Sequence, residues 1–324
     1  MRAAVCPAYG PPEVVGVREL PCPDLAPGQA RVRVAAAAVN FPDVLLVAGT
    51  YQVKVTPPFV PGSEFSGVVT EISPGIDAFA VGDRVAGTAM FGAFAEQVCI
   101  SVDALTPISD GVDDHTAAAS GVAFRTAYHA LRSVARITTG DDIVVLGAGG
   151  GVGLAAVGLA TALGARVTAV ASNPEKLAAA ARHGAVRGIN HRTEDLRAAL
   201  REALPGGATA VLDPVGGELS EPALRSLARG GRFVTIGFAS GSVARIPLNL
   251  VLVKGIQVLG FQFQDIPADE FTRNETELRH LLASGTVAPL VGASYPLTEA
   301  AAALRHVADG RAIGKVVVDV CAPV

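Results

Sequence analysis

The segment "VVLGAGGGVGLAAVGLATALGARVTAVASNPEK", Val144–Lys176, gives the strongest indication of fold in this 324-residue chain. A run of glycines follows an apolar, strand-like segment and opens an alanine-rich helical segment. Glycines at such a turn let the backbone approach a phosphate closely, and the N-terminus of the helix supplies N–H groups. Because Ala148 stands at the first glycine position, the pattern only approximates GxGxxG. The context still predicts a dinucleotide site at Gly149, Gly150, Gly151, Val152 and Gly153.

The segment after the next predicted strand indicates which dinucleotide to expect. NAD-binding proteins place Asp or Glu about 20 residues beyond the glycines, but Ala171 stands at this point. Nearby, Ser172 offers a hydroxyl and Lys176 a positive charge, and "INHRTED" adds His191 and Arg192. These groups suit the 2′-phosphate of NADPH, so we expect NADPH as the cofactor. A solvated surface position is the alternative for Lys176, and it is the preferred interpretation for Arg192.

Residue composition and the pattern of strand-like and helical segments divide the chain into three zones. Strand-like and helical runs alternate from about residue 116 to 255, a pattern typical of βαβ units and a parallel sheet. Residues 1–115 are rich in Pro, Gly and short valine runs, which favours a barrel-like β domain. We expect the mixed tail, residues 256–324, to fold back on this first zone. The prediction is an α/β protein with a doubly wound Rossmann domain at 116–255 and a β-rich catalytic domain formed by the rest.

Composition narrows the class of function. The formal charge is −4 and half of the residues are hydrophobic. A mildly acidic chain without a basic stripe gives no reason to expect nucleic acid or an anionic membrane as a partner. The four cysteines are scattered, so neither a disulfide framework nor a zinc lobe is indicated. The first residues lack the apolar core of a signal peptide, and we expect a cytoplasmic protein.

Several motifs occur in a characteristic order: "AAVNFPDVLLVAGTYQ", "PGSEFSGVV", "GVAFRTAYHAL", "GAGGGVG", "VLDPVGG", "TIGFASG" and "GKVVV". Together they resemble the medium-chain dehydrogenase/reductase superfamily, and within it the zinc-free quinone oxidoreductase branch that includes zeta-crystallin. The resemblance covers residues 1–320. It implies a GroES-like fold for the β-rich domain, a Rossmann fold for the cofactor domain, and a homodimer.

Departures from the zinc-dependent members of this superfamily argue against a metal. Asn40 stands at the position of the usual cysteine ligand and Ser63 at that of the usual histidine, and neither can serve as a zinc ligand here. The region of the four-cysteine lobe holds only Cys99. Glu64 is retained, and we expect it to be a hydrogen-bonded structural acid. We therefore predict no metal.

Without a Lewis acid, oxidation of a simple alcohol is difficult, whereas reduction of an activated acceptor remains feasible. The resemblance implies that Tyr51 and Asn40 lie beside the nicotinamide. Both are candidates for donating a hydrogen bond to the negative charge that develops on the acceptor oxygen. The alternatives are packing at a loop for Tyr51 and a turn position for Asn40. We expect Asp43 to fix that turn.

The resemblance also implies roles for several individual residues. It implies that Thr126 contacts the nicotinamide end, that Gly237 and Phe238 form a loop past the cofactor, and that Phe261 walls the hydride site, in a segment that also forms a dimer edge. It further implies that Lys315 reaches the cofactor, although a surface lysine is the preferred interpretation. His191 stands where members of this branch commonly have tyrosine.

Two functions compete within this chemistry, and a third lies outside it. The leading interpretation is an NADPH-dependent quinone reductase. The alternative is an NADPH-dependent reductase of enones or enoyl thioesters, although few basic residues are available for a coenzyme A thioester: Lys54, Arg245, Lys254 and Arg273. A non-catalytic, crystallin-like NADPH-binding protein is the third.

Overall fold

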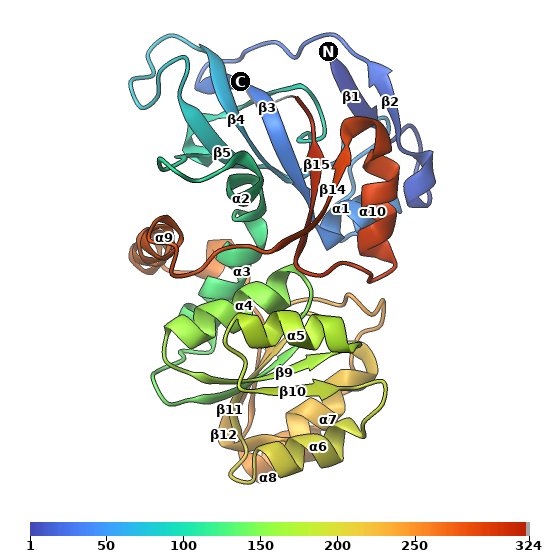
Figure 1. Ribbon diagram of the computed structural model, residues 1–324, viewed down its shortest axis with the longest axis vertical. Coiled ribbons are helices and arrows are strands. Elements are labelled where there is room, and N and C mark those ends of the chain that lie inside the picture. The colour runs from blue at the N-terminus through green and yellow to red at the C-terminus, as the bar shows by residue number, and fades with distance from the viewer. Residues whose placement is uncertain (322–324) are drawn as a thin grey trace. The chain divides into compact units, whose positions relative to one another are not determined.

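The structure is a computed structural model that describes residues 1–321 (Figure 1). The chain divides into two compact units. The first consists of Met1–Val122 together with the segment from Pro289 onward, and the second is Ala123–Ala288. Each unit contains its own sheet and its own hydrophobic core.

The second unit is built on a six-stranded sheet in which every pair of neighbours is parallel. Its spatial order is β10-β9-β8-β11-β12-β13, so the order reverses between β8 and β11. This is the order of a dinucleotide-binding Rossmann sheet, and the predicted doubly wound sheet is confirmed. The strands are β8 (Asp142–Leu146), β9 (Arg166–Ala171), β10 (Arg187–Asn190), β11 (Ala208–Asp213), β12 (Leu227–Thr235) and β13 (Gln257–Leu259).

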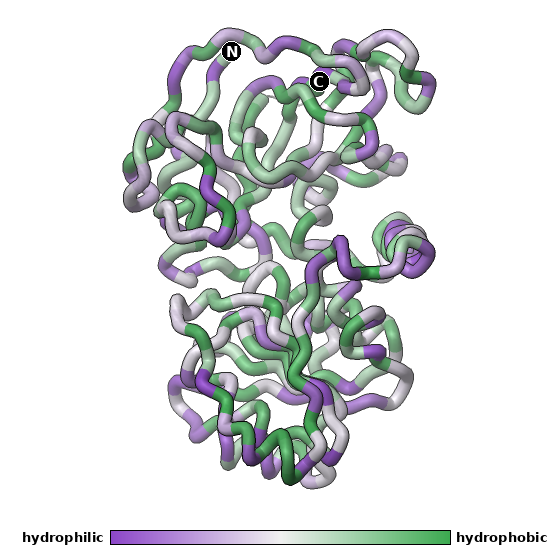
Figure 2. The backbone as a smooth tube through the Cα atoms, turned by 180° about the vertical axis from the view of Figure 1, so that it is seen from behind, coloured by the Kyte–Doolittle hydropathy of each residue, from purple (hydrophilic) through white to green (hydrophobic). Residues whose placement is uncertain are grey.

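Helices cover both faces of this sheet, with α4 and α5 on one face and α6, α7 and α8 on the other (Figure 1). Coverage on both faces explains why the central strands are almost wholly apolar. Figure 2 shows these strands coloured mainly as hydrophobic. The helices are α3 (Val122–His129), α4 (Gly151–Ala162), α5 (Pro174–Arg182), α6 (Leu196–Ala203), α7 (Ser220–Arg225), α8 (Leu248–Lys254) and α9 (Ala268–Ala283). Short turns are η3 (Ala130–Val134), η4 (Gly217–Leu219) and η5 (Phe263–Asp265).

The first unit is β-rich, as predicted. Its seven-stranded path runs β14-β15-β3-β4-β5-β7, with β6 also paired to β3. All pairs are antiparallel except β14 with β15. The strands are β3 (Gln29–Val39), β4 (Glu64–Ile72), β5 (Arg84–Thr88), β6 (Gln97–Ser101), β7 (Leu105–Pro107), β14 (Val291–Pro296) and β15 (Lys315–Asp319), and a separate ribbon joins β1 (Arg2–Val5) to β2 (Gly16–Glu19).

The tail of the chain closes this unit. Strand β15 pairs with β3 across a separation of almost the whole chain, with Val316 opposite Val39 and Val317 opposite Ala38. Its valines are buried in the core. The helices of the unit are α1 (Phe41–Val47), α2 (Asp114–Ala119) and α10 (Ala300–Ala308), with short turns η1 (Pro12–Val14), η2 (Val102–Ala104) and η6 (Leu297–Glu299).

The boundaries of the compact units differ from the predicted domain boundaries of 116 and 255. Residues 256–288 stay with the parallel-sheet unit because β13 pairs with β12 and because α9 is bonded to α3. The last three residues of the predicted tail lie outside the described part of the chain.

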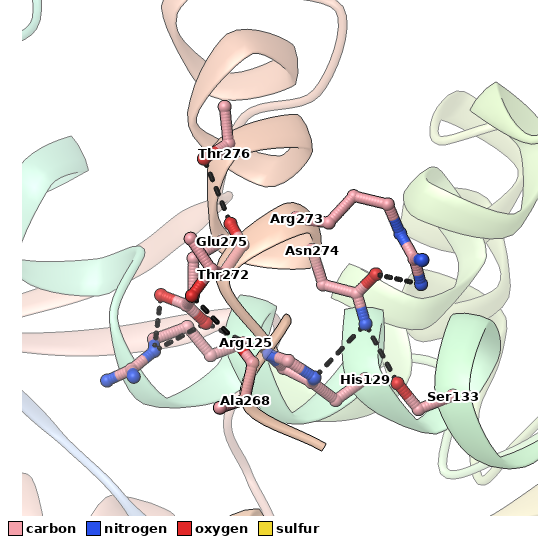
Figure 3. Close-up of polar contacts among 9 residues, drawn as sticks. All are labelled: Arg125, His129, Ser133, Ala268, Thr272, Arg273, Asn274, Glu275 and Thr276. Atoms are coloured by element: carbon pink, nitrogen blue, oxygen red, sulfur yellow. Dashed lines mark hydrogen bonds and ion pairs between the residues drawn. The ribbon is translucent and has the colours of Figure 1, made fainter. Parts of the chain in front are cut away.

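A polar network attaches α9 to α3 (Figure 3). The buried ring of His129 contacts Glu275 through Nε2 at 3.0 Å, and the Asn274 amide approaches its Nδ1 at 3.3 Å. The same amide donates to Ser133 at 2.8 Å, and Arg125 donates to Glu275 at 3.0 Å. Nothing near His129 in the sequence indicates these partners, because Glu275 lies 146 residues further along the chain.

Candidate active site

The glycine loop joins β8 to α4 at the carboxyl edge of the parallel sheet. A Cβ atom at Gly153 would lie 2.1 Å from the Gly147 carbonyl oxygen, and one at Gly149 would lie 2.4 Å from Cβ of Lys176. Both glycines are therefore needed for close packing of the loop. At Gly150, which caps α4 without a side-chain hydrogen bond, a Cβ would meet only the Gly147 oxygen at 3.6 Å. Glycines at these positions are the feature that allows a pyrophosphate to approach the helix N-terminus.

Predicted cofactor residues gather at the neighbouring ends of β9 and β10. The two strands are parallel neighbours, so their carboxyl ends meet at one edge. The backbone N–H of His191 donates to the Ala171 carbonyl at 3.1 Å, which places His191 and Arg192 beside the start of the Ser172–Lys176 segment. Lys176 lies in the first turn of α5, whose N-cap Asn173 accepts a hydrogen bond from its backbone N–H.

Burial and neighbouring positive charge lower the pKa values of Lys176 and His191 at this edge. Burial first, and then the positive charge of Arg192, lowers the pKa of Lys176. Burial likewise lowers the pKa of His191, and the charges of Arg192 and Lys176 lower it further. The positive charges of Lys176 and Arg192, beside a histidine that can gain a proton, are electrostatically suited to receive an anionic group.

Two loops at the same edge of the sheet, after β11 and β12, are tied together. The buried carboxylate of Asp213 accepts hydrogen bonds from the backbone N–H groups of Val215 and Gly216 and from the Ser220 hydroxyl, at 2.9, 2.8 and 2.5 Å. The N–H of Gly237 donates to the Asp213 carbonyl at 3.3 Å. In the sequence, "VLDPVGG" stands out only as a family motif, and nothing beside Asp213 indicates its organising role.

The remaining predicted positions of this unit lie on its helices and outer loops. Thr126 lies half-buried on α3, and Phe238 is half-buried in the loop after β12, where a Cβ at Gly216 would lie 2.9 Å from its ring. Phe261 follows β13 and packs edge-on against Phe263, with ring centroids 5.6 Å apart.

In the first unit, four polar side chains form a closed buried cluster: Asn40, Ser63, Glu64 and Lys315. The Lys315 Nζ donates to Glu64 Oε1 and Asn40 Oδ1, both at 2.6 Å, and to the Val39 carbonyl at 3.2 Å. Lys315 is only 4% exposed and Glu64 only 1%, so the preferred interpretation of Lys315 as a surface lysine is wrong. The three hydrogens of the ammonium group are all engaged.

Strand pairing creates this cluster. Glu64 is the first residue of β4 and lies opposite Ala38 of β3, while Lys315 opens β15, whose next residue lies opposite Val39. Asn40 directly follows the last residue of β3, Val39, and is the N-cap of α1. Its amide nitrogen donates to Glu64 Oε1 at 2.8 Å and to Ser63 Oγ at 3.1 Å, so both amide hydrogens are used inside the protein.

Glu64 is hydrogen-bonded, as expected of a structural acid. Besides Lys315 and Asn40, it accepts a hydrogen bond from the Val122 backbone N–H through Oε2 at 2.7 Å. Within residues 1–321, no group of three or more His, Cys, Asp or Glu side chains is arranged to hold a metal ion. Tyr51 lies in the loop after α1, half-buried against the core of the first unit, and its backbone N–H donates to the Leu45 carbonyl at 3.2 Å.

Comparisons with known proteins bear on both units. Residues 26–110 match the family model of the alcohol dehydrogenase GroES-like domain, and residues 151–279 match that of zinc-binding dehydrogenases. The quinone oxidoreductase-like protein 2 of Rattus norvegicus is 35% identical over 322 residues, which are 97% of this chain and 91% of that protein. A mycocerosic acid synthase-like polyketide synthase of Mycolicibacterium smegmatis is 34% identical over 310 residues, which are 91% of this chain but only 14% of that protein.

Solved structures agree with these relatives. The crystal structure of Escherichia coli quinone oxidoreductase complexed with NADPH superposes with a TM-score of 0.92 at 29% identity, covering 99% of this chain and 100% of that one. Within residues 1–321, none of the helices combines the length and the apolar composition that crossing a bilayer requires. The chain belongs to the medium-chain dehydrogenase/reductase superfamily of oxidoreductases, with a GroES-like and a Rossmann domain.

Proposed function

We propose that the protein is an NADPH-dependent reductase that transfers hydride to a quinone without a metal. The observation that carries the proposal is the glycine loop beside the cations of β9 and β10. The glycines leave room for a pyrophosphate, and the cations suit an additional phosphate on the adenosine ribose. The NADPH with which the Escherichia coli quinone oxidoreductase is complexed supports the same cofactor.

The parts of the cofactor are assigned to different residues. The backbone of Gly149–Gly153 would hold the pyrophosphate. Ser172, Lys176 and His191, with Arg192, would hold the 2′-phosphate through charge-assisted hydrogen bonds. Toward the nicotinamide, the proposed contacts are Thr126, Gly237, Phe238 and Phe261. Because the three ammonium hydrogens of Lys315 are engaged inside the protein, we propose that Lys315 acts on the cofactor side only indirectly, by organising the cluster with Asn40 and Glu64. The nicotinamide supplies the hydride.

On the acceptor side, Tyr51 is the proposed donor to the quinone oxygen on which negative charge develops. Its phenol group is half-buried on a loop, where it can be presented to a ligand. Asn40 was the second candidate donor, but both of its amide hydrogens are engaged by Ser63 and Glu64. We therefore propose that Asn40 acts by holding Lys315 and Glu64 in place.

The test follows NADPH oxidation with EDTA present, using ortho- and para-quinones as acceptors and NADH in parallel. We expect turnover with quinones, faster with NADPH than with NADH. Substituting Tyr51→Phe should lower kcat by about 10²-fold, the usual loss for one donor to a developing oxyanion. A kcat unchanged in Tyr51→Phe would refute the donor role, and inactivity toward every quinone would refute the substrate class.

The polyketide synthase relative favours a second candidate, reduction of an enoyl thioester. Hydride transfer to an α,β-unsaturated carbonyl uses the same cofactor and leaves a similar negative charge on oxygen. Including crotonyl-type enones and thioesters in the acceptor panel separates the two. A kcat/KM at least tenfold higher for the thioesters than for every quinone would replace the quinone assignment while leaving the NADPH assignment intact.

We also propose a homodimer through the outer edge of the parallel sheet. Strand β13 ends the sheet, and α8 beside it exposes three apolar side chains, Leu248, Leu252 and Val253, with Leu252 83% exposed. An uncovered strand edge with apolar neighbours favours association. Light scattering after size exclusion should give twice the chain mass, and Leu252→Lys should give the single mass.

A further inference from the structure

Asp43 is a fully buried carboxyl group beside the closed cluster of the first unit, and the proposed function gives it no role. It is the third residue of α1, and its Oδ2 accepts the backbone N–H of Asn40 at 2.7 Å. Within the described residues, its other oxygen, Oδ1, has no hydrogen-bond partner. A buried polar atom without a partner is uncommon and costly, and it is costlier still on an ionised group.

The charges around Asp43 explain why its proton matters. The charged groups that act on it are Lys315 of β15 and Glu64 of β4, and the Ser63 hydroxyl favours its ionised form. Lys315 already donates its three ammonium hydrogens to Val39, Asn40 and Glu64. One ammonium group therefore faces two carboxyl groups and is bonded to only one of them.

Burial decides the balance between the two forms of Asp43. Desolvation raises the pKa of Asp43 to about 7, against the opposing effects of the Asn40 N–H, the Ser63 hydroxyl and the Lys315 charge. If Asp43 is protonated, the ion pair of Lys315 and Glu64 leaves the cluster neutral. If Asp43 loses its proton, the cluster acquires one buried negative charge that no direct ion pair compensates.

We propose that Asp43 is a positioning residue, which as a protonated carboxyl keeps Asn40 and Lys315 in the arrangement that turnover requires. Ionised Asp43 would compete with Glu64 for the ammonium group of Lys315 and so draw Lys315 away from the Asn40 oxygen. The Asn40 amide would then lose one of the partners that fix its orientation. The effect on turnover rests on the proposed function, whereas the proton and the Asn40 arrangement do not.

The test compares the wild-type protein with Asp43→Asn, which removes the titration while keeping the shape of the side chain. Asp113→Asn is the matched control, because Asp113 is exposed and accepts a backbone N–H at the start of another short helix, α2. Infrared difference spectra between pH 5 and pH 9 should show one carboxylic acid C=O band that disappears on ionisation near neutral pH. We expect this band in the wild type and in Asp113→Asn, and its loss in Asp43→Asn.

A second readout follows the Asn40 side-chain amide by 15N NMR, with the signal assigned by its loss in Asn40→Ala. We expect the amide to shift with the same midpoint as the infrared band in the wild type and not to titrate in Asp43→Asn. Absence of the band, or an amide that keeps its titration in Asp43→Asn, would overturn the proposal. Both readouts remain valid if no quinone or enone is turned over, so failure of the proposed function would be distinguishable.

The pH profile then connects the proton to turnover. In the wild type, kcat should fall about tenfold per pH unit once Asp43 ionises, because the rate follows the protonated fraction. Asp43→Asn should lack this limb, with little change in KM for NADPH. If Asp43→Asn does not fold, Ser63→Ala provides the test: losing a hydroxyl that favours the ionised form should move both the infrared midpoint and the limb to higher pH. A limb that stays in Asp43→Asn, or does not move in Ser63→Ala, would contradict the positioning role.

Discussion

Lys315 of the first unit and Lys176 of the second differ in the charge of their neighbours. Lys315 of the first unit lies buried against the carboxylate of Glu64, with every ammonium hydrogen engaged. Lys176 of the second unit lies half-buried near Arg192 and His191, where burial and the positive charge of Arg192 lower its pKa.

The difference shows what each group of charges is suited to do. An ammonium group paired with a carboxylate inside the protein is neutralised by that partner, so Lys315 contributes organisation. Cations that repel one another at a sheet edge gain most from an anion that arrives from outside, so Lys176 is suited to binding. The comparison therefore predicts that substitutions at Lys315 change folding, whereas those at Lys176 change affinity for the cofactor.

The largest expected effect is loss of stability in Lys315→Met. Removing one partner of a buried ion pair leaves Glu64 uncompensated, which costs about 3–5 kcal/mol in the free energy of unfolding. Denaturant unfolding followed by circular dichroism measures this loss. The double variant Lys315→Met with Glu64→Gln should recover much of it, because no buried charge is then left alone.

The matched control for this experiment is Arg166→Met, which breaks the exposed ion pair with Asp142 in the other unit. Surface pairs contribute little, so its unfolding midpoint should stay close to that of the wild type. Equal midpoint shifts in Arg166→Met and Lys315→Met would contradict the view that burial gives the Lys315 pair its importance.

The intermediate effect is expected on cofactor affinity in Lys176→Met. Losing a charge-assisted contact to the 2′-phosphate should raise the Kd for NADPH by about 10- to 100-fold, while leaving the Kd for NADH and the unfolding midpoint nearly unchanged. Fluorescence titration of the reduced nicotinamide measures both constants. Arg201→Met removes an exposed cation of α6 and serves as the control for a general charge effect. Equal weakening toward NADPH and NADH would show that Lys176 does not recognise the 2′-phosphate.

The smallest effect concerns the pH dependence of NADPH binding through His191. Burial, Arg192 and Lys176 lower the pKa of His191 below its usual 6.5, so the free protein holds a neutral imidazole at neutral pH. A bound phosphate favours the protonated ring, so NADPH affinity should increase as the pH falls below about 6.5 and should not depend on His191 above about 7.5. Calorimetry at fixed salt, with His191→Gln to subtract the titration of the phosphate itself, measures this contribution. Identical profiles for the two proteins would remove His191 from the phosphate site.

The sequence was informative wherever function depends on local order. The glycines lie within a few residues of the strand and helix that they join. Lys176 lies five residues after β9, and His191 directly follows β10. Parallel strands bring their carboxyl ends to one edge of the sheet. The alternation of strand-like and helical segments was therefore enough to predict that these residues lie close together at that edge. The β-rich character of the first zone was predictable from its Pro, Gly and short valine runs.

The fold class and the alternation of strands and helices in the Rossmann domain were thus predictable from local patterns, and the same patterns named the residues that we propose to bind a dinucleotide phosphate. Only the tertiary structure decided that Lys315 is buried and not on the surface, that the hydrogens of Asn40 are already engaged, and that Asp43 lies without a partner for one oxygen. The physical reason is distance along the chain: β15 pairs with β3 across about 275 residues, as do the two partners Lys315 and Asn40. Burial and charge pairing between such distant residues depend on strand register, which no local pattern specifies.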